Sequence, residues 1–87
     1  MYAVVVRVTI SDAEQAQEEL VNTVVPMVSQ APGFVAGYWT RLDDSGLSTV
    51  IFDSEDAARR MADRVPQSMP EFVTFEGAEV REVVASA

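Results

Sequence analysis

Residues 31–52 constrain the fold more than any other part of the chain. The run Ala31-Pro32-Gly33 is typical of a helix end followed by a tight turn in which the glycine takes a positive φ. Two segments rich in β-branched and aromatic residues come next, Phe34–Leu42 and residues 47–53, and each predicts a strand. The residues between them, Asp43-Asp44-Ser45-Gly46, predict a hairpin loop with Gly46 in the left-handed conformation.

The start of the chain predicts another strand, Tyr2–Ile10. One face of this strand carries only apolar groups, namely Tyr2, Val4, Val6, Val8 and Ile10. The other face carries Ala3, Val5, Arg7 and Thr9, which are mostly small or apolar. A strand that is apolar on both faces is usually covered on both, so we expect this one in the middle of a sheet.

The segment between this strand and residue 31 has helical spacing. Ser11 or Asp12 is suited to the N-cap, and apolar residues then recur three and four positions apart. Pro26 interrupts the pattern because it has no N–H to donate to the carbonyl of Asn22. We therefore expect either a kink at Pro26 or a second helical segment that begins there.

A second helix is predicted to begin after Ser54, which is a good N-cap, and to end before Pro66. The last strand is expected within residues 72–84, with Gly77 marking a bulge or bend. The complete order is β-α-β-β-α-β, the ferredoxin-like arrangement of the α+β class, with a four-stranded antiparallel sheet. The 87 residues make a single domain, 1–87.

Two helices can cover only one face of such a sheet. Strict alternation would place Phe34 and Tyr38 on one face of their strand, and Val35 and Trp39 on the other. Large apolar groups would then lie on both faces, and leaving the uncovered ones in water is unfavourable. We therefore expect a homodimer whose two sheets pack face to face and form a barrel.

Composition excludes several classes of function. The chain has no His and no Cys, so a serine or cysteine hydrolase site has no base or thiol, and a zinc site would have only carboxylates. A net charge of −8 disfavours nucleic acid and anionic membranes as partners, because phosphates repel it. The sequence shows no membrane span and no signal peptide, so a cytoplasmic location is expected.

The chain resembles the dimeric α+β barrel superfamily and, within it, the antibiotic-biosynthesis-monooxygenase-like (ABM-like) domains. The resemblance covers almost the whole chain and rests on four features: the Val-rich opening strand, Ala31-Pro32-Gly33-Phe34, the hairpin through Asp44-Ser45-Gly46, and the run from Val50 to Ala57. The superfamily includes cofactor-independent oxygenases, haem-degrading enzymes and muconolactone-isomerase-like proteins. Haem ligation by His is excluded here, and neither a cofactor nor a metal is expected.

The resemblance implies a candidate ligand site for a small aromatic or polyketide-like molecule. In relatives of this type that use no cofactor, the protein holds the ring of the substrate and stabilises its anion. Tyr38 or Trp39 could hold a ring, and Arg7 or Arg41 could stabilise an anion. The alternative is structural: the aromatic pair fills the core and the interface, Arg7 pairs with Glu79, and Arg41 pairs with Asp43 at the rim of the sheet.

Two functions follow from these alternatives. A ligand-binding protein or cofactor-independent monooxygenase should have a closed pocket on the helix side of the sheet, reached by an arginine and by Tyr38 or Trp39. A non-catalytic structural or ligand-binding homodimer needs no such pocket, because its aromatic side chains fill the barrel.

Overall fold

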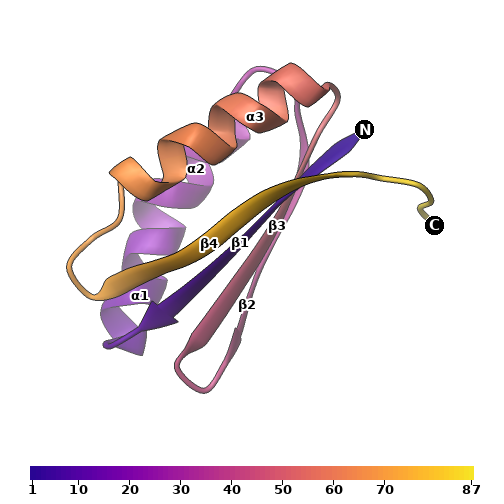
Figure 1. The fold of residues 1–87 in the computed structure, drawn as a ribbon. Helices are drawn as coiled ribbons and strands as arrows, with labels where there is room; N and C mark the ends of the chain where they lie inside the picture. The colour runs from indigo at the N-terminus through magenta and orange to yellow at the C-terminus, as the bar shows by residue number, and fades with distance from the viewer.

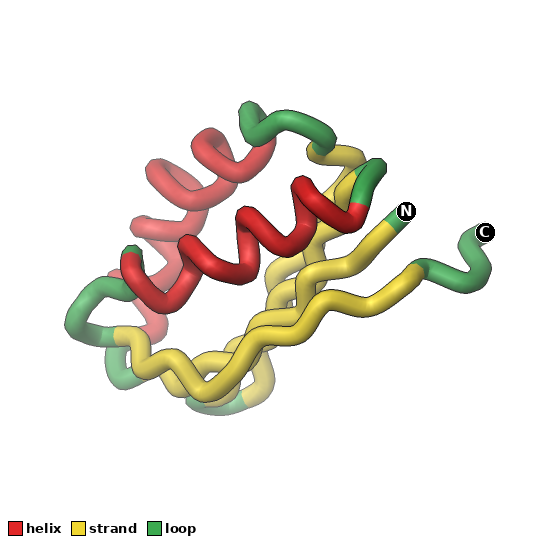
Figure 2. The backbone as a smooth tube through the Cα atoms, turned by 45° about the horizontal axis from the view of Figure 1, so that its top comes forward, coloured by secondary structure: helices red, strands yellow, loops and turns green.

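The structure is a computed structural model that describes residues 1–87. The elements follow in the order β1 (Tyr2–Ile10), α1 (Ala13–Glu19), the π-helical segment η1 (Leu20–Val24), α2 (Val25–Ser29), β2 (Phe34–Leu42), β3 (Ser45–Phe52), α3 (Glu55–Arg64), the 3₁₀ turn η2 (Val65–Gln67) and β4 (Val73–Glu82). All helices lie on one side of the sheet (Figures 1 and 2). The predicted α+β order is confirmed. No helix is long and apolar enough to cross a membrane.

The four strands pair in the order β2-β3-β1-β4, and every pairing is antiparallel. The central place predicted for β1 is confirmed, since this strand pairs with β3 on one side and with β4 on the other. The pairing of β1 with β4 shifts register between Arg7 and Val8, which face Gly77 and Phe75 respectively. The irregularity expected at Gly77 therefore lies there.

The first helix, made of α1, η1 and α2, begins at a capping residue and changes its type at a proline. The Oδ1 atom of Asp12 accepts a hydrogen bond from the backbone N–H of Gln15 at 3.1 Å, so Asp12 is the N-cap. Before Pro26 the helix widens into the π-helical segment η1 and then continues as α2. The missing N–H of Pro26 thus coincides with the change of helix type, as the predicted kink or restart requires.

The hairpin between β2 and β3 differs from the prediction. The turn consists of Asp43 and Asp44 alone, and Asp43 has the positive φ, 54°. Gly46 lies in β3 and has no positive φ. It is needed for space, because a Cβ atom there would be 2.7 Å from Cγ2 of Val8. Asp tolerates the left-handed region better than most residues, which explains the shorter turn.

A bulge in β2 also corrects the predicted faces. Phe34 pairs with Phe52, whereas Ala36 pairs with Ile51, so Val35 is an extra residue. The extra residue reverses the alternation after Phe34. Phe34 therefore shares the helix side with Trp39, and not the face of Tyr38 as strict alternation predicted. On the helix side its ring meets that of Phe52 edge to face, with centroids 6.4 Å apart.

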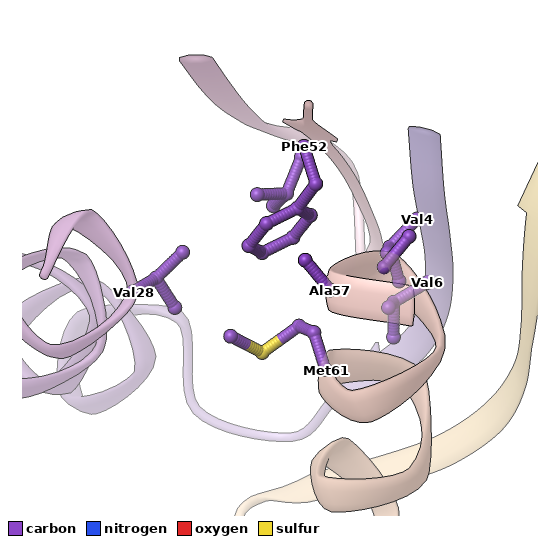
Figure 3. Close-up of a cluster of buried hydrophobic side chains, with 8 residues drawn as sticks. Val4, Val6, Val28, Phe52, Ala57 and Met61 are labelled. Atoms are coloured by element: carbon purple, nitrogen blue, oxygen red, sulfur yellow. The ribbon is translucent and has the colours of Figure 1, made fainter. Parts of the chain in front are cut away.

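The core lies between the sheet and the helices (Figure 3). Phe52 and Val4 are its largest fully buried side chains, with 1% and 0% of their surface exposed. Val28 reaches the core from α2 and Met61 from α3. The start of α3 is stabilised as predicted, since the Oγ atom of Ser54 accepts a hydrogen bond from the N–H of Ala57 at 3.2 Å.

The opposite face of the sheet has no layer over it, and we call it the open face. Strand register assigns to it alternate residues of all four strands: Ala36, Tyr38, Thr40 and Leu42 of β2; Ser45, Leu47, Thr49 and Ile51 of β3; Ala3, Val5, Arg7 and Thr9 of β1; and Thr74, Gly77, Glu79 and Arg81 of β4. The β2–β3 half of this face is largely apolar, and the β1–β4 half carries its charged side chains.

Candidate functional site

The four predicted site residues divide between the two faces of the sheet. Trp39 pairs with Ser48, which lies opposite Val6 of the core face, so Trp39 and its second neighbour Arg41 lie on the helix side. Tyr38 and Arg7 lie on the open face. The structure therefore brings Trp39 and Arg41 together on one face of one strand, whereas Tyr38 and Arg7 lie two strands apart on the other face.

Trp39 is half-buried and packs against the core cluster. Its ring lies across Gly37, where an added Cβ atom would be 2.8 Å from Cη2 of the indole. The glycine thus provides the space that lets the ring lie close to the strand. This packing fixes the orientation of the indole and leaves part of its surface accessible.

Arg41 extends from the same face of β2, about 7 Å along the strand from Trp39. Its Nη1 atom donates a hydrogen bond to the backbone carbonyl of Asp43 at 3.1 Å. The predicted partner residue is correct, but the contact is to the main chain and no salt bridge forms. The ion pairs of the structure involve only Arg7, Arg59 and Arg81 as cations. Arg41 therefore presents an exposed positive charge beside a fixed indole.

The open face exposes large apolar groups from β2 and β3. Tyr38 is 67% exposed, Leu42 76% and Leu47 39%, and the bulge residue Val35 at the β2 edge is 48% exposed. Side chains of this size are seldom left in contiguous contact with water. This half of the open face therefore has the character of an interface.

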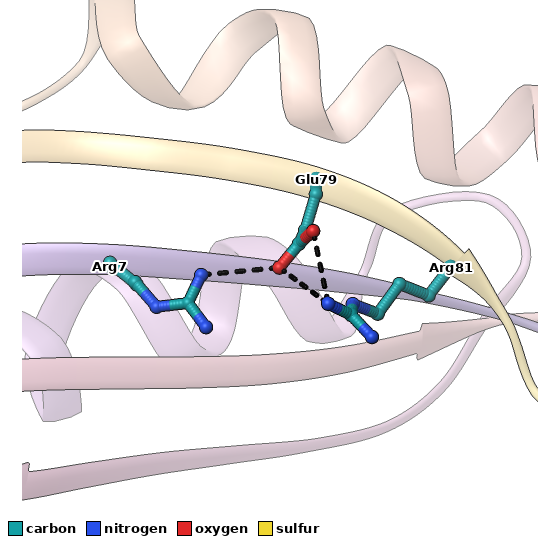
Figure 4. Close-up of polar contacts among 3 residues, drawn as sticks. All are labelled: Arg7, Glu79 and Arg81. Carbon is teal, nitrogen blue, oxygen red and sulfur yellow. Dashed lines mark hydrogen bonds and ion pairs between the residues drawn. The ribbon is translucent and has the colours of Figure 1, made fainter.

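The β1–β4 half of the open face holds a three-residue ion cluster (Figure 4). The Glu79 carboxylate accepts hydrogen bonds from Arg7 at 3.1 Å and from Arg81 at 3.2 Å. The hydrogen bond from Arg7, followed by that from Arg81, holds the pKa of Glu79 below its ordinary value. Nearby, the Thr9 hydroxyl donates to the Glu76 carboxylate at 2.7 Å. Two arginines thus share the Glu79 carboxylate, and the Glu76 carboxylate is bonded to a neutral hydroxyl.

The pair of Arg7 with Glu79 is confirmed, and Arg81 is a second partner of the same carboxylate. Its contribution could have been found from the sequence, because residues 79 and 81 lie two apart in a strand and share a face. The pairing of Val5 with Glu79 also places this carboxylate beside Arg7 of the neighbouring strand.

Two shallow hollows stand out on the surface, and none of the four predicted site residues lines either. One, of about 310 Å³, lies between the helical segments α1 and η1 and the side chain of Phe72. The other, of about 270 Å³, lies between α3 and the outer edge of β4, and Glu79 contributes to its wall. Both are open to solvent. No group of three or more metal-ligating side chains is present.

The fold matches that of a known oxygenase. The chain superimposes on a variant of SnoaB, a cofactor-independent oxygenase from Streptomyces nogalater, with a TM-score of 0.74 and 20% sequence identity. The match covers 98% of this chain and 94% of the other. The ferredoxin-like α+β fold predicted from the sequence is thereby confirmed, and it is the fold of this oxygenase.

A second match is weaker. The haem degrader MhuD from Mycobacterium tuberculosis, with two haems in its active site, gives a TM-score of 0.49 at 18% identity, over 97% of this chain and 98% of the other. That score is too low for a residue-level comparison. By sequence, no protein-family model and no curated protein matches the chain.

Proposed function

We propose that the protein is a homodimer, assembled through its open faces, that binds a small aromatic anion beside Trp39 and Arg41. The observation that carries the assembly is the exposure of Tyr38, Leu42 and Leu47 on a face that no helix covers. Burial of each such side chain contributes about 1.5–3 kcal/mol. A second copy of the sheet covers all of them at once.

The distribution of charge supports the same partner. The open face carries Arg7, Arg81 and Glu79, and the hydrogen bond from Thr9 brings the Glu76 carboxylate to it as well, so positive and negative groups are equal in number. The entire net charge of −8 therefore belongs to the rest of the molecule. Two copies repel one another at their other surfaces and can approach without repulsion at the open face.

A charge placed on the apolar half tests this assembly. Leu47→Glu should dissociate the dimer, because two carboxylates would be buried at the interface without partners. Val21→Glu is the matched control, since Val21 is 59% exposed but lies in η1 on the helical layer. Light scattering coupled to size-exclusion chromatography reports the masses. A Leu47→Glu protein that stays dimeric contradicts the proposed interface.

The ligand is inferred from the Trp39–Arg41 pair. The indole offers a flat, oriented surface for stacking, and the guanidinium group offers an unpaired positive charge on the same face of β2. A planar phenolate or aromatic carboxylate satisfies both groups. Neither of the two hollows described above includes this pair, and we place the site at the rim of the helical layer and not in a closed pocket.

Titration with 4-nitrophenolate tests the site, with Trp39, the single tryptophan, as a fluorescent reporter. Arg41→Ala should weaken binding about tenfold or more, the effect of losing one charge-assisted hydrogen bond. Arg60→Ala is the matched control, because Arg60 also contacts only a backbone carbonyl, that of Asp56. Equal affinity of the wild type and Arg41→Ala, with the dimer intact in both, rejects the site.

Cofactor-independent oxygenation is a second candidate, favoured by the fold shared with SnoaB. In such a reaction the deprotonated ring supplies the electrons to dioxygen. One oxygen atom becomes bonded to a ring carbon. The other leaves as water, which carries away the hydrogens that the substrate loses. The task of this chain would be to hold the ring against Trp39 and to stabilise the anion with Arg41.

Oxygen uptake distinguishes the two functions. With a polycyclic phenol and a metal chelator present, an oxygenase consumes dioxygen at a rate that falls in Arg41→Ala. A ligand-binding protein without activity binds the same compound and leaves oxygen consumption at the rate of the free phenol.

A further inference from the structure

Three of the four glycines are required by their own chain. Gly33 has a φ of 86°, and an added Cβ atom would be 2.6 Å from Oδ1 of Asp53. The Cβ position of Gly37 is occupied by the Trp39 ring, and that of Gly46 by Val8. In each case, a side chain would be strained or would collide with a neighbour.

Gly77 is different. Its φ is outside the left-handed region, and an added Cβ atom would meet no atom within 4 Å. The register shift beside it requires no glycine either, because a bulge needs one only where φ is positive. Glycine within a strand weakens the strand relative to a residue with a side chain. Nothing inside the chain compensates for this loss.

The position of Gly77 indicates what occupies the space. It pairs with Arg7, so a side chain at this position would project from the open face. Around it lie the Arg7–Glu79 ion pair and the Thr9–Glu76 hydrogen bond. The glycine therefore leaves a gap within the charge-balanced half of the open face. Glycine in a strand often marks a place where another molecule approaches closely.

We infer that Gly77 is a point of close approach of the second copy, and that a side chain of the partner's open face fills the gap above it. This inference rests on the proposed homodimer and adds to it a contact in the charged half. The occupant is a second copy because the surrounding charged side chains, two arginines and two glutamates, are equal in number, which leaves no net charge to attract an ionic ligand. The space above Gly77 thus lets the β1–β4 halves of the two open faces come into contact.

Sedimentation equilibrium of Gly77→Val tests the inference. Valine is well suited to a strand, so the variant should fold, but its side chain would occupy the gap. We expect the dimer dissociation constant to rise at least tenfold, and Gly77→Ala to give a smaller rise in the same direction. Ala78→Val is the matched control: it enlarges the adjacent residue, which is exposed and lies on the other face of β4.

Each outcome decides a separate point. Wild-type affinity in Gly77→Val overturns the inference and leaves the proposed dimer standing. A wild-type chain that stays monomeric overturns the dimer itself. Loss of the fold in Gly77→Val, seen by circular dichroism, contradicts the free space above the residue and also overturns the inference. Equal weakening by Ala78→Val would show that the effect is not specific to the open face, with the same consequence.

Discussion

At the scale of single residues, position within a face decides what each side chain does. The alternation of β1 was readable from the sequence, and the pairing of Arg7 with Glu79 was one of the two predicted alternatives for this arginine. The role of Gly46 was not readable, because it depends on Val8 of a strand 38 positions earlier in the chain, whose distance only the folded sheet defines. The sequence suggested a backbone reason for this glycine, whereas the actual reason is steric.

Gly46→Ala tests that steric role through the sign of its effect. At an ordinary backbone position, replacing glycine by alanine raises stability. Here the new methyl group would lie 2.7 Å from Val8 and 3.0 Å from Ile10, so we expect a loss of about 1–3 kcal/mol in the free energy of unfolding. Urea denaturation at a fixed protein concentration measures it. An unchanged or increased stability contradicts the close packing.

Glu79 gives a prediction for the dependence on pH. Its pKa in the folded protein is held below the ordinary value of 4.5 by hydrogen bonds from Arg7 and then from Arg81. As the pH falls, Glu79 binds a proton in the unfolded chain before it does so in the folded protein. The stabilisation from Glu79 is therefore fully present above pH 4.5 and is lost as the pH falls through the lower pKa of the folded state.

The pKa of Glu79 should rise towards its ordinary value in Arg7→Gln, which removes the strongest of these hydrogen bonds. A carbon-detected NMR titration of the Glu79 carboxyl group measures the shift. Arg60→Gln serves as the control, since Arg60 contacts no carboxylate. Identical titration midpoints in the wild type and Arg7→Gln would show that the ion pair does not persist in solution.

At the scale of elements, the sequence predicted the boundaries of helices better than the irregularities inside strands. Ser54 and Pro26 marked a helix start and a change of helix type because a cap and a missing N–H act locally. The bulge at Val35 had no such signal, since it appears only in the register between β2 and β3. That single extra residue reversed the predicted face of Phe34.

The cap of α3 provides an element-scale test. Ser54→Ala removes the hydrogen bond to the Ala57 N–H and should lower the free energy of unfolding by about 1 kcal/mol. Ser54→Asp should restore most of that loss, because Asp is an equally good cap and its charge lies at the positive end of the helix. Thermal unfolding of the three proteins compares them. Equal stability of Ser54→Ala and the wild type would show that this cap does not stabilise α3.

At the scale of the whole molecule, the β-α-β-β-α-β order and the central position of β1 were predictable, because hydrophobic periodicity and helix boundaries are encoded locally. The candidate site was less predictable. Adjacent residues of a strand point to opposite faces, so alternation separates Tyr38 from Trp39 and places Trp39 with Arg41, but only the register shows that this pair lies on the helix side. The proposed function gives the two faces different tasks: ligand binding on the helix side and assembly on the open side.

The mass of the wild-type protein in solution tests the central claim most directly. Sedimentation equilibrium at micromolar concentration and moderate ionic strength measures it without a probe or a substitution. The exposed apolar half and the charge-balanced half of the open face predict a particle of twice the 9.5 kDa chain mass. A single species of 9.5 kDa across the concentration range would contradict the assembly.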